Sequence, residues 1–134
     1  MALRYLLDTN ICIYIANRRP SGVQARFAQL APGDVGMSLV TYGELRYGAE
    51  KSARREESLT TLEQLTTLIP VLLPDAETGA RYGAVRTALE AAGTTIGNND
   101  LWIAAHAAAL DVTLVSNNTR EFERVEGLKL ENWT

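Results

Sequence analysis

The sequence contains few of the residues that form disulfides or bind soft metals. Among its 134 residues there is one cysteine, Cys12, and one histidine, His106. One cysteine excludes an intramolecular disulfide and a cysteine-based zinc cluster, and we expect a cytoplasmic location. One histidine excludes a histidine-rich zinc site and a metal-free ribonuclease that needs two imidazoles.

Long apolar runs and an excess of positive charge are absent as well. Runs such as Leu68–Leu73 are far shorter than the ~18 residues that cross a bilayer, and Asp8 interrupts the first apolar stretch before it reaches signal-peptide length. We therefore expect neither a membrane span nor export. The 13 basic and 16 acidic residues give a net charge of −3, the wrong sign for coating nucleic acid through bulk electrostatics. Any polyanion must be bound at a local site.

Several familiar catalytic motifs are missing. The sequence has no Gly-x-Ser-x-Gly nucleophile turn, no glycine-rich phosphate loop and no dinucleotide-binding fingerprint. Neither Lys51 nor Lys129 has a carboxylate two residues before it, which argues against nucleases that pair an acid with a nearby lysine. The segment Asp8-Thr9-Asn10 lacks the second acid and the supporting lysine of a phosphoaspartate enzyme.

The composition and the order of apolar segments predict one α/β domain. Hydrophobic residues make up 46% and charged residues 22%, as in ordinary globular proteins, and the length suits a single domain over residues 1–134. Short apolar runs alternate with helical patterns, which predicts a mostly parallel central sheet flanked by helices. The expected strands are Ala2–Leu7, Val35–Leu39, Val71–Leu73, Val112–Val115 and Leu128–Leu130. The first expected helix begins at the polar residues after the first strand and ends at Asn17. The other expected helices are Val23–Leu30, Thr41–Lys51, Ser58–Leu68, Glu77–Ala92 and Leu101–Leu110.

Four acidic residues fall where expected strands end or helices begin. Asp8 follows the first strand, Glu44 lies in the first turn after the second, and Asp100 opens the helix before Val112–Val115. Glu121 follows that strand by a short turn. In a parallel α/β sheet these positions share one edge, where ligands usually bind. Carboxylates gathered there repel one another unless a cation is present, and Mg²⁺ or Mn²⁺ suits them because such ions bind oxygen and activate water for attack on phosphodiesters.

Each acid also has a purely structural interpretation. Asp8 and Asp100 could each stabilise a helix N-terminus, and the Thr41–Glu44 segment matches a capping box. Glu121 lies in a polar stretch and could be a solvated surface charge. His106 is about 240° around an ideal helix from Asp100, so we expect it to pack away from the acids. The spacing of the acids alone leaves the catalytic and structural interpretations open.

Four segments resemble those of PIN-domain ribonucleases of the VapC toxin family. They read LLDTN near the start, YGELRYGAEKS in the middle, then IGNNDLWIAAHA and LVSNNTREFERVEGLKLENW, and the match spans essentially the whole chain in order. The resemblance implies a PIN-like three-layer sandwich and a Mg²⁺-dependent endoribonuclease, with Mn²⁺ as the alternative ion. It also implies the toxin of a type II toxin–antitoxin pair, which hydrolyses RNA, with tRNA as the expected substrate, and arrests translation.

Carried over residue by residue, the resemblance assigns catalytic positions to Asp8, Glu44 and Asp100, with Asp8 and Asp100 as direct metal ligands. For the fourth catalytic position we expect Glu121, with Asn118 as a neutral ligand or water-holding residue beside it. In this interpretation Glu44 and Glu121 position or deprotonate the attacking water, and in-line hydrolysis leaves a 5′-phosphate.

The same resemblance suggests supporting residues and partners. We expect the hydroxyls of Thr9 and Ser116 to support the acids, and local arginines to contact RNA in place of a basic surface. The candidate arginines are Arg18, Arg19, Arg81 and Arg86. The expected partners are a second copy of the chain and an antitoxin that inserts a basic side chain among the carboxylates, in a heterotetramer or larger assembly. Two alternatives stay open, a PIN-like module that binds RNA or a partner without cutting and a nuclease that processes RNA without an antitoxin.

Overall fold

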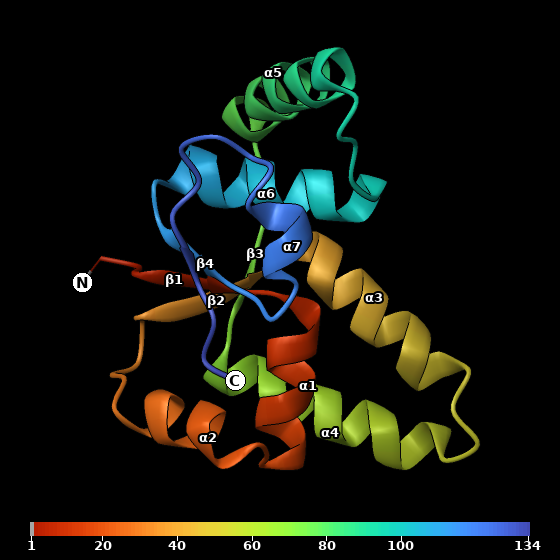
Figure 1. Cartoon of the computed structure of the whole chain (residues 1–134). Coiled ribbons are helices and arrows are strands. Elements are labelled where there is room, and N and C mark those ends of the chain that lie inside the picture. The colour runs from red at the N-terminus through yellow and green to blue at the C-terminus, as the bar shows by residue number, and fades with distance from the viewer. Residues whose placement is uncertain (1) are drawn as a thin grey trace.

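The computed structural model describes residues 2–134, and at its centre is a five-stranded parallel sheet with strand order β3-β2-β1-β4-β5 (Figure 1). The expected α/β architecture, a parallel sheet flanked by helices, is therefore confirmed. The strands are β1 (Tyr5–Leu7), β2 (Val35–Ser38), β3 (Val71–Leu72), β4 (Thr113–Val115) and β5 (Leu130–Glu131). The helices are α1 (Thr9–Asn17), α2 (Ser21–Ala28), α3 (Leu39–Glu50), α4 (Arg55–Leu68), α5 (Ala76–Ala92), α6 (Asn98–Leu110) and α7 (Thr119–Phe122).

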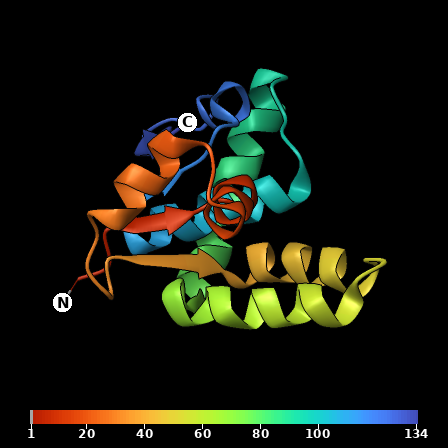
Figure 2. The ribbon, with the colours of Figure 1, turned by 90° about the horizontal axis from the view of Figure 1, so that it is seen from below.

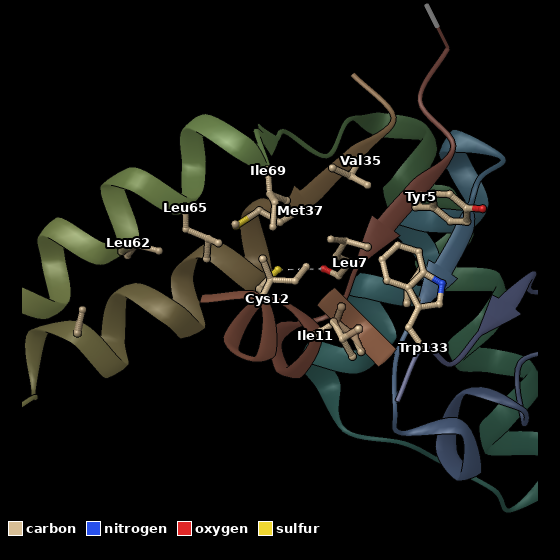
Figure 3. Packing of buried hydrophobic residues seen from close by; sticks show 14 residues of the cluster. Tyr5, Leu7, Ile11, Cys12, Val35, Met37, Leu62, Leu65, Ile69 and Trp133 are labelled. Carbon is tan, nitrogen blue, oxygen red and sulfur yellow. Dashed lines mark hydrogen bonds between the residues drawn. The ribbon is translucent and has the colours of Figure 1, made fainter. Parts of the chain in front are cut away.

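Helices cover both faces of the sheet, so the protein has three layers (Figure 1). Successive residues of β1 point to opposite faces: Tyr5 and Leu7 pack in one core, and Leu6 packs in the other. The first core joins the sheet to α1 and to the hairpin of α3 and α4, which lie side by side in Figure 2. Figure 3 shows this core, in which the buried Cys12 thiol donates to the Leu7 carbonyl at 3.8 Å. The second core lies under α5 and α6.

The strand order brings the carboxyl ends of β1 and β4 together. β2 and β3 lie on one side of β1, and β4 and β5 lie on the other. Leu7 of β1 pairs with Val115 of β4, so the residues that follow these strands, Asp8 and Ser116, are neighbours. Open parallel sheets bind ligands at such a point, where the chain changes direction across the sheet.

Some helix boundaries differ from the expected ones. α3 begins at Leu39 because Ser38 is its N-cap and accepts a hydrogen bond from the Val40 amide. The expected capping box at Thr41–Glu44 is therefore wrong. α4 begins at Arg55, three residues before the expected start at Ser58. The four-residue helix α7 has no counterpart among the expected helices, because so short a segment carries no helical period.

Two strand boundaries also shift by a few residues. β1 begins at Tyr5 rather than Ala2, and β5 covers Leu130–Glu131 rather than Leu128–Leu130. Strands end where hydrogen bonding to a neighbouring strand ends, and an apolar pattern does not reveal that point. Within residues 2–134 no helix combines the length and apolar character that a membrane span requires.

Candidate active site

Asp8 is the most buried acid of the site. It follows β1 and is only 5% exposed. One carboxylate oxygen accepts the Thr9 amide at 2.8 Å, which caps α1, and the other accepts the Ser116 hydroxyl at 2.7 Å. Burial raises the pKa of Asp8, while these two hydrogen bonds oppose the rise. Asp8 is thus both a helix cap and a carboxylate held in a fixed orientation.

Glu44 lies in the second turn of α3, and its carboxylate contacts two other elements. Its Oε1 accepts the Thr9 hydroxyl of α1 at 2.6 Å, and its Oε2 accepts the Asn99 carboxamide of α6 at 3.5 Å. Because Ser38 caps α3, Glu44 has no part in capping that helix. Its carboxylate instead faces the carboxyl edge of the sheet, toward α1 and α6.

Asp100 is in the first turn of α6 and is half-buried. Burial, together with a hydrogen bond to the Glu121 carboxyl, raises the pKa of Asp100 to about 7. The negative charges of Asp8, Glu121 and Glu44 act in the same direction. Asp8, Glu44 and Glu121 therefore all lie close enough to Asp100 to raise its pKa.

Asn118 and Glu121 occupy the turn after β4 and form one hydrogen-bonded unit. The Asn118 amide donates to the Ser116 hydroxyl oxygen at 2.9 Å, and the Asn118 carboxamide donates to Glu121 Oε2 at 3.1 Å. Glu121 contacts Asp100, whereas Asn118 lines the hollow between the acids. The structure thus brings both candidates for the fourth position to the site, with Asn118 orienting Glu121.

The acids surround an open hollow of about 380 Å³. Its lining residues are Asp8, Thr9, Asn10, Glu44, Asp100, Asn117 and Asn118. Asn10 and Asn117 were not among the expected site residues. The Asn10 carboxamide donates to Asn117 Oδ1 at 3.3 Å, and Asn117 donates to the Tyr14 hydroxyl at 2.9 Å. Their position beside Asp8-Thr9 and Asn118 is the sequence signal that could have identified them.

The arginines proposed for RNA contacts do not line this hollow. Arg81 pairs with Glu77 at 3.1 Å and Arg86 with Glu90 at 3.0 Å, both along α5. Arg18 and Arg19 follow the C-terminal end of α1, whereas the site lies at its N-terminal end. Sequence position alone did not indicate which end or face of a helix these residues occupy.

His106 is buried on α6, away from the hollow. Its Nδ1 lies 2.9 Å from the Ser38 hydroxyl, whose oxygen also accepts the Val40 amide. Burial lowers the pKa of His106, which favours the neutral ring as acceptor of the Ser38 hydrogen. This contact links α6, which carries Asp100, to the N-terminus of α3.

The donor set of the site suits a hard divalent cation. The ionisable groups facing the hollow are all carboxylates, and no lysine or arginine among residues 2–134 lines it. No group of three or more acidic, histidine or cysteine side chains in this part of the chain is arranged to hold a metal ion by itself. Mg²⁺ typically takes one or two protein carboxylates and completes its shell with water and phosphate oxygens, so the residues present fit such an ion.

Comparison with known proteins agrees with this fold. Residues 5–128 match the PIN domain family. Ribonuclease VapC1 of Haemophilus influenzae (strain R2866) is 43% identical over 131 residues, covering 97% of this chain and 98% of that protein. The tRNA(fMet)-specific endonuclease VapC of Shigella flexneri is 43% identical over 132 residues, covering 98% of this chain and 99% of that protein.

A solved structure shows the same likeness in three dimensions. A chain of VapBC-1 from nontypeable Haemophilus influenzae matches this structure with a TM-score of 0.90 and 42% sequence identity, covering 98% of both chains. The resemblance inferred from the four sequence segments is therefore confirmed. This chain belongs to the VapC family of PIN-domain ribonucleases, enzymes that cleave phosphodiester bonds.

Proposed function

We propose that this protein is a Mg²⁺-dependent endoribonuclease that cleaves tRNA and arrests translation as the toxin of a type II toxin–antitoxin pair. One observation carries the proposal: the carboxylates of Asp8, Glu44 and Asp100 line one open hollow that no basic side chain of residues 2–134 lines, and Glu121 lies beside Asp100. A scaffold has no structural need for such a cluster, because like charges at close range oppose folding. The name of the Shigella flexneri relative supports tRNA as the substrate class.

In this proposal Asp8 and Asp100 hold the ion. Bound Mg²⁺ would polarise the scissile phosphate and lower the pKa of a bound water. The Ser116 hydroxyl and the Thr9 amide keep the Asp8 carboxylate in place. Because metal ligands bind in their deprotonated form, Asp100 would hold the ion as a carboxylate.

Glu44 and Glu121 act on the attacking water. The Thr9 hydroxyl orients Glu44, and Asn118 orients Glu121, so both carboxylates can accept hydrogen bonds from water and take its proton. The water oxygen bonds to phosphorus while the bond from phosphorus to the 3′ oxygen breaks. The 3′ oxygen then takes up a proton, and the products are a 5′-phosphate and a 3′-hydroxyl.

An antitoxin would bind along the groove between α1 and the α3–α4 hairpin. This groove has a volume of about 430 Å³, an apolar wall that includes Ile13, Leu45 and Leu62, and Thr9 and Glu44 at its border with the acid hollow. A partner segment that lies in the groove could therefore place an arginine among the carboxylates, where a guanidinium binds in bidentate fashion. The name of the related structure, VapBC-1, supports an antitoxin as partner.

We further propose a homodimer that assembles with the antitoxin into a heterotetramer or larger complex in the cytoplasm, where tRNA is found. Leu39 and Leu73, which are 44% and 73% exposed, are apolar side chains available for such contacts. Light scattering of the purified chain, alone and with its antitoxin, measures both assemblies.

The test compares wild type with Asp8→Asn, using labelled tRNA in Mg²⁺ and in EDTA. Asn caps helices as well as Asp does, so the variant should fold normally. Loss of a residue that only supports a metal ligand typically lowers activity ~10–100-fold. Asp8 is itself a proposed ligand, so the cleavage rate of the variant should fall by more than this. Glu63→Gln, an exposed acid on α4, is the matched control and should cut at the wild-type rate.

Each other outcome has a definite meaning. Full cleavage in EDTA would rule out a divalent ion. Binding of tRNA without cleavage in Mg²⁺ would favour the non-cleaving RNA-binding module. Cleavage without growth arrest in cells that lack the antitoxin would favour an RNA-processing nuclease. Sequencing the 5′ ends of the fragments identifies the RNA and the cut.

A further inference from the structure

One face of α3 carries a stripe of half-buried and exposed residues that continues beyond Glu44. Val40, Glu44, Tyr47 and the C-cap Lys51 are spaced three or four residues apart, so their side chains lie on the same side of the helix, and Gly43 lies between Val40 and Tyr47 on that side. The stripe begins at the acid site and runs toward the C-terminal end of α3. Apart from Glu44, its residues do not line the groove proposed for the antitoxin, which faces α1 and α4.

A second hollow, of about 620 Å³, lies along this stripe. Its lining residues are Val40, Gly43, Glu44, Tyr47 and Asn99. Glu44 lines both this hollow and the acid hollow, and the Asn99 carboxamide that reaches Glu44 lies at the boundary. A Cβ at Gly43 would meet no atom within 4 Å, so the hollow is open at the middle of the stripe. The two hollows are therefore neighbours that share Glu44 as a lining residue.

Tyr47 provides an aromatic surface at this second hollow. Its side chain is 65% exposed, which is unusual for a large aromatic residue. The Lys51 ammonium lies 4.5 Å from the centroid of its ring. An exposed aromatic ring beside a cation is the combination that proteins use to stack an unpaired base and contact the adjoining phosphate.

We infer that Tyr47, Lys51 and Asn99 form a nucleobase subsite for the RNA strand on one side of the scissile phosphate. An unpaired base stacks on the Tyr47 ring, the Lys51 ammonium contacts a phosphate of the same segment, and the Asn99 carboxamide hydrogen-bonds the base edge. This inference rests on the proposed ribonuclease function. It also supplies a local site at which a chain of net charge −3 can hold RNA.

The test uses the full chain and an unstructured synthetic RNA in which one abasic ribonucleotide is moved through each position in turn. Cleavage is followed in Mg²⁺ for kcat and KM, and binding is followed separately for Kd. Tyr47→Ala should raise KM and Kd roughly five- to a hundredfold with little change in kcat, and Tyr47→Phe should retain wild-type values because its ring still stacks. Leu68→Ala, which removes a 58% exposed side chain at the end of α4, is the matched control.

The abasic RNA separates stacking from a structural effect. At one position in the RNA, the missing base should weaken binding to wild type and to Tyr47→Phe. Tyr47→Ala, which has no ring for that base to stack on, should bind the abasic and the intact RNA with the same Kd. Unchanged KM and Kd in Tyr47→Ala, or an abasic penalty equal in all variants, would overturn the inference. So would loss of self-association in Tyr47→Ala with unchanged RNA binding, which would make Tyr47 a protein contact. If wild type binds the RNA without cutting it, the proposed ribonuclease function is refuted, but the Kd values still test the nucleobase subsite. If wild type neither binds nor cuts the RNA, the proposed function and the subsite are both refuted.

Discussion

The Asp100 carboxyl is half-buried, and a hydrogen bond with Glu121 favours its protonated form. Burial and the neighbouring negative charges make the protonated form stable up to about neutral pH. Asp8 has a raised pKa for the same main reason, burial. At the scale of single residues, the site therefore carries repulsion that a bound cation would relieve, and this repulsion can be measured.

Replacing Asp100 by Asn should leave the metal-free protein as stable as wild type or more stable, because the change removes a repelled charge. If Asp100 only complemented the dipole of α6, the same change would cost about 0.3–1 kcal/mol. Mg²⁺, which stabilises wild type by binding the folded state, should stabilise the variant much less. Thermal melts of both proteins in EDTA and in millimolar Mg²⁺ measure these effects. A variant that melts lower in EDTA, gains as much from Mg²⁺ as wild type and still cuts RNA would identify Asp100 as a capping charge.

The stability of the metal-free protein should depend on pH. The pKa of Asp100 is about 7 in the folded protein against an ordinary value of 3.8, so the folded state binds more protons between these values. The contribution is fully present below about pH 4 and is lost as the pH rises through 7. Because Asp100 is half-buried and partly screened by solvent, we expect a loss of about 1–2 kcal/mol. Urea unfolding in EDTA at a series of pH values measures it. Asp100→Asn should show a smaller loss, and equal losses in the two proteins would contradict the assignment.

At the scale of elements, β2 and β3 approach each other too closely for a side chain at Gly36. A Cβ there would lie 2.6 Å from Leu72 Cδ1 and 3.3 Å from the Pro70 carbonyl oxygen. Gly36→Ala should therefore cost about 1–3 kcal/mol in the free energy of unfolding, measured by urea denaturation. Gly79→Ala on α5, where a Cβ meets nothing within 4 Å, should instead stabilise by about 0.5–1 kcal/mol. Equal effects at the two positions would show that Leu72 moves aside without cost.

Ser38 connects β2, α3 and α6 through one hydroxyl. It caps α3 and contacts buried His106. Ser38→Ala should cost about 1–3 kcal/mol and should also slow RNA cleavage, because Glu44 and Asp100 lie on the two connected helices. Ser38→Thr keeps the hydroxyl and should restore both properties in part. If Ser38→Ala melts at the wild-type temperature, the hydroxyl does not hold these helices together.

At the scale of the whole molecule, a net charge of −3 means that RNA must be held by a few local contacts. For single strands the slope of log K against log salt is about −0.7 per phosphate neutralised, so we expect a slope of about −1 to −2. The measurement is Kd for RNA at increasing KCl, using Glu44→Gln, which keeps both proposed metal ligands. A slope of about −5 or steeper would instead indicate an extended basic surface.

Much of the architecture could be predicted from residue patterns. Short apolar runs alternating with helical periods are local signals, and they predicted the parallel sheet and placed Asp8 directly after β1. The pattern misassigned the start of α3, since both Ser38 and Thr41 are good caps and only the end of β2 pairing selects Ser38. The short helix α7 has no helical period that a sequence pattern could reveal, and its own residue Phe122 anchors it in the second core.

By itself the sequence determined the fold class, the family and the acids that stand after strands or at helix starts, because these depend on local patterns and segment motifs. Only the tertiary structure decided which side chains meet. The pairing of β1 with β4 brings Asp8 to Ser116, and the turn into α7 brings Glu121 to Asp100. The direction of each helix decided that Asn10 faces the hollow and that Arg81 and Arg86 do not. Contacts between residues far apart in the chain depend on the order of the strands and on how each helix is rotated against the sheet. Residues that are close in sequence do not determine either property by themselves.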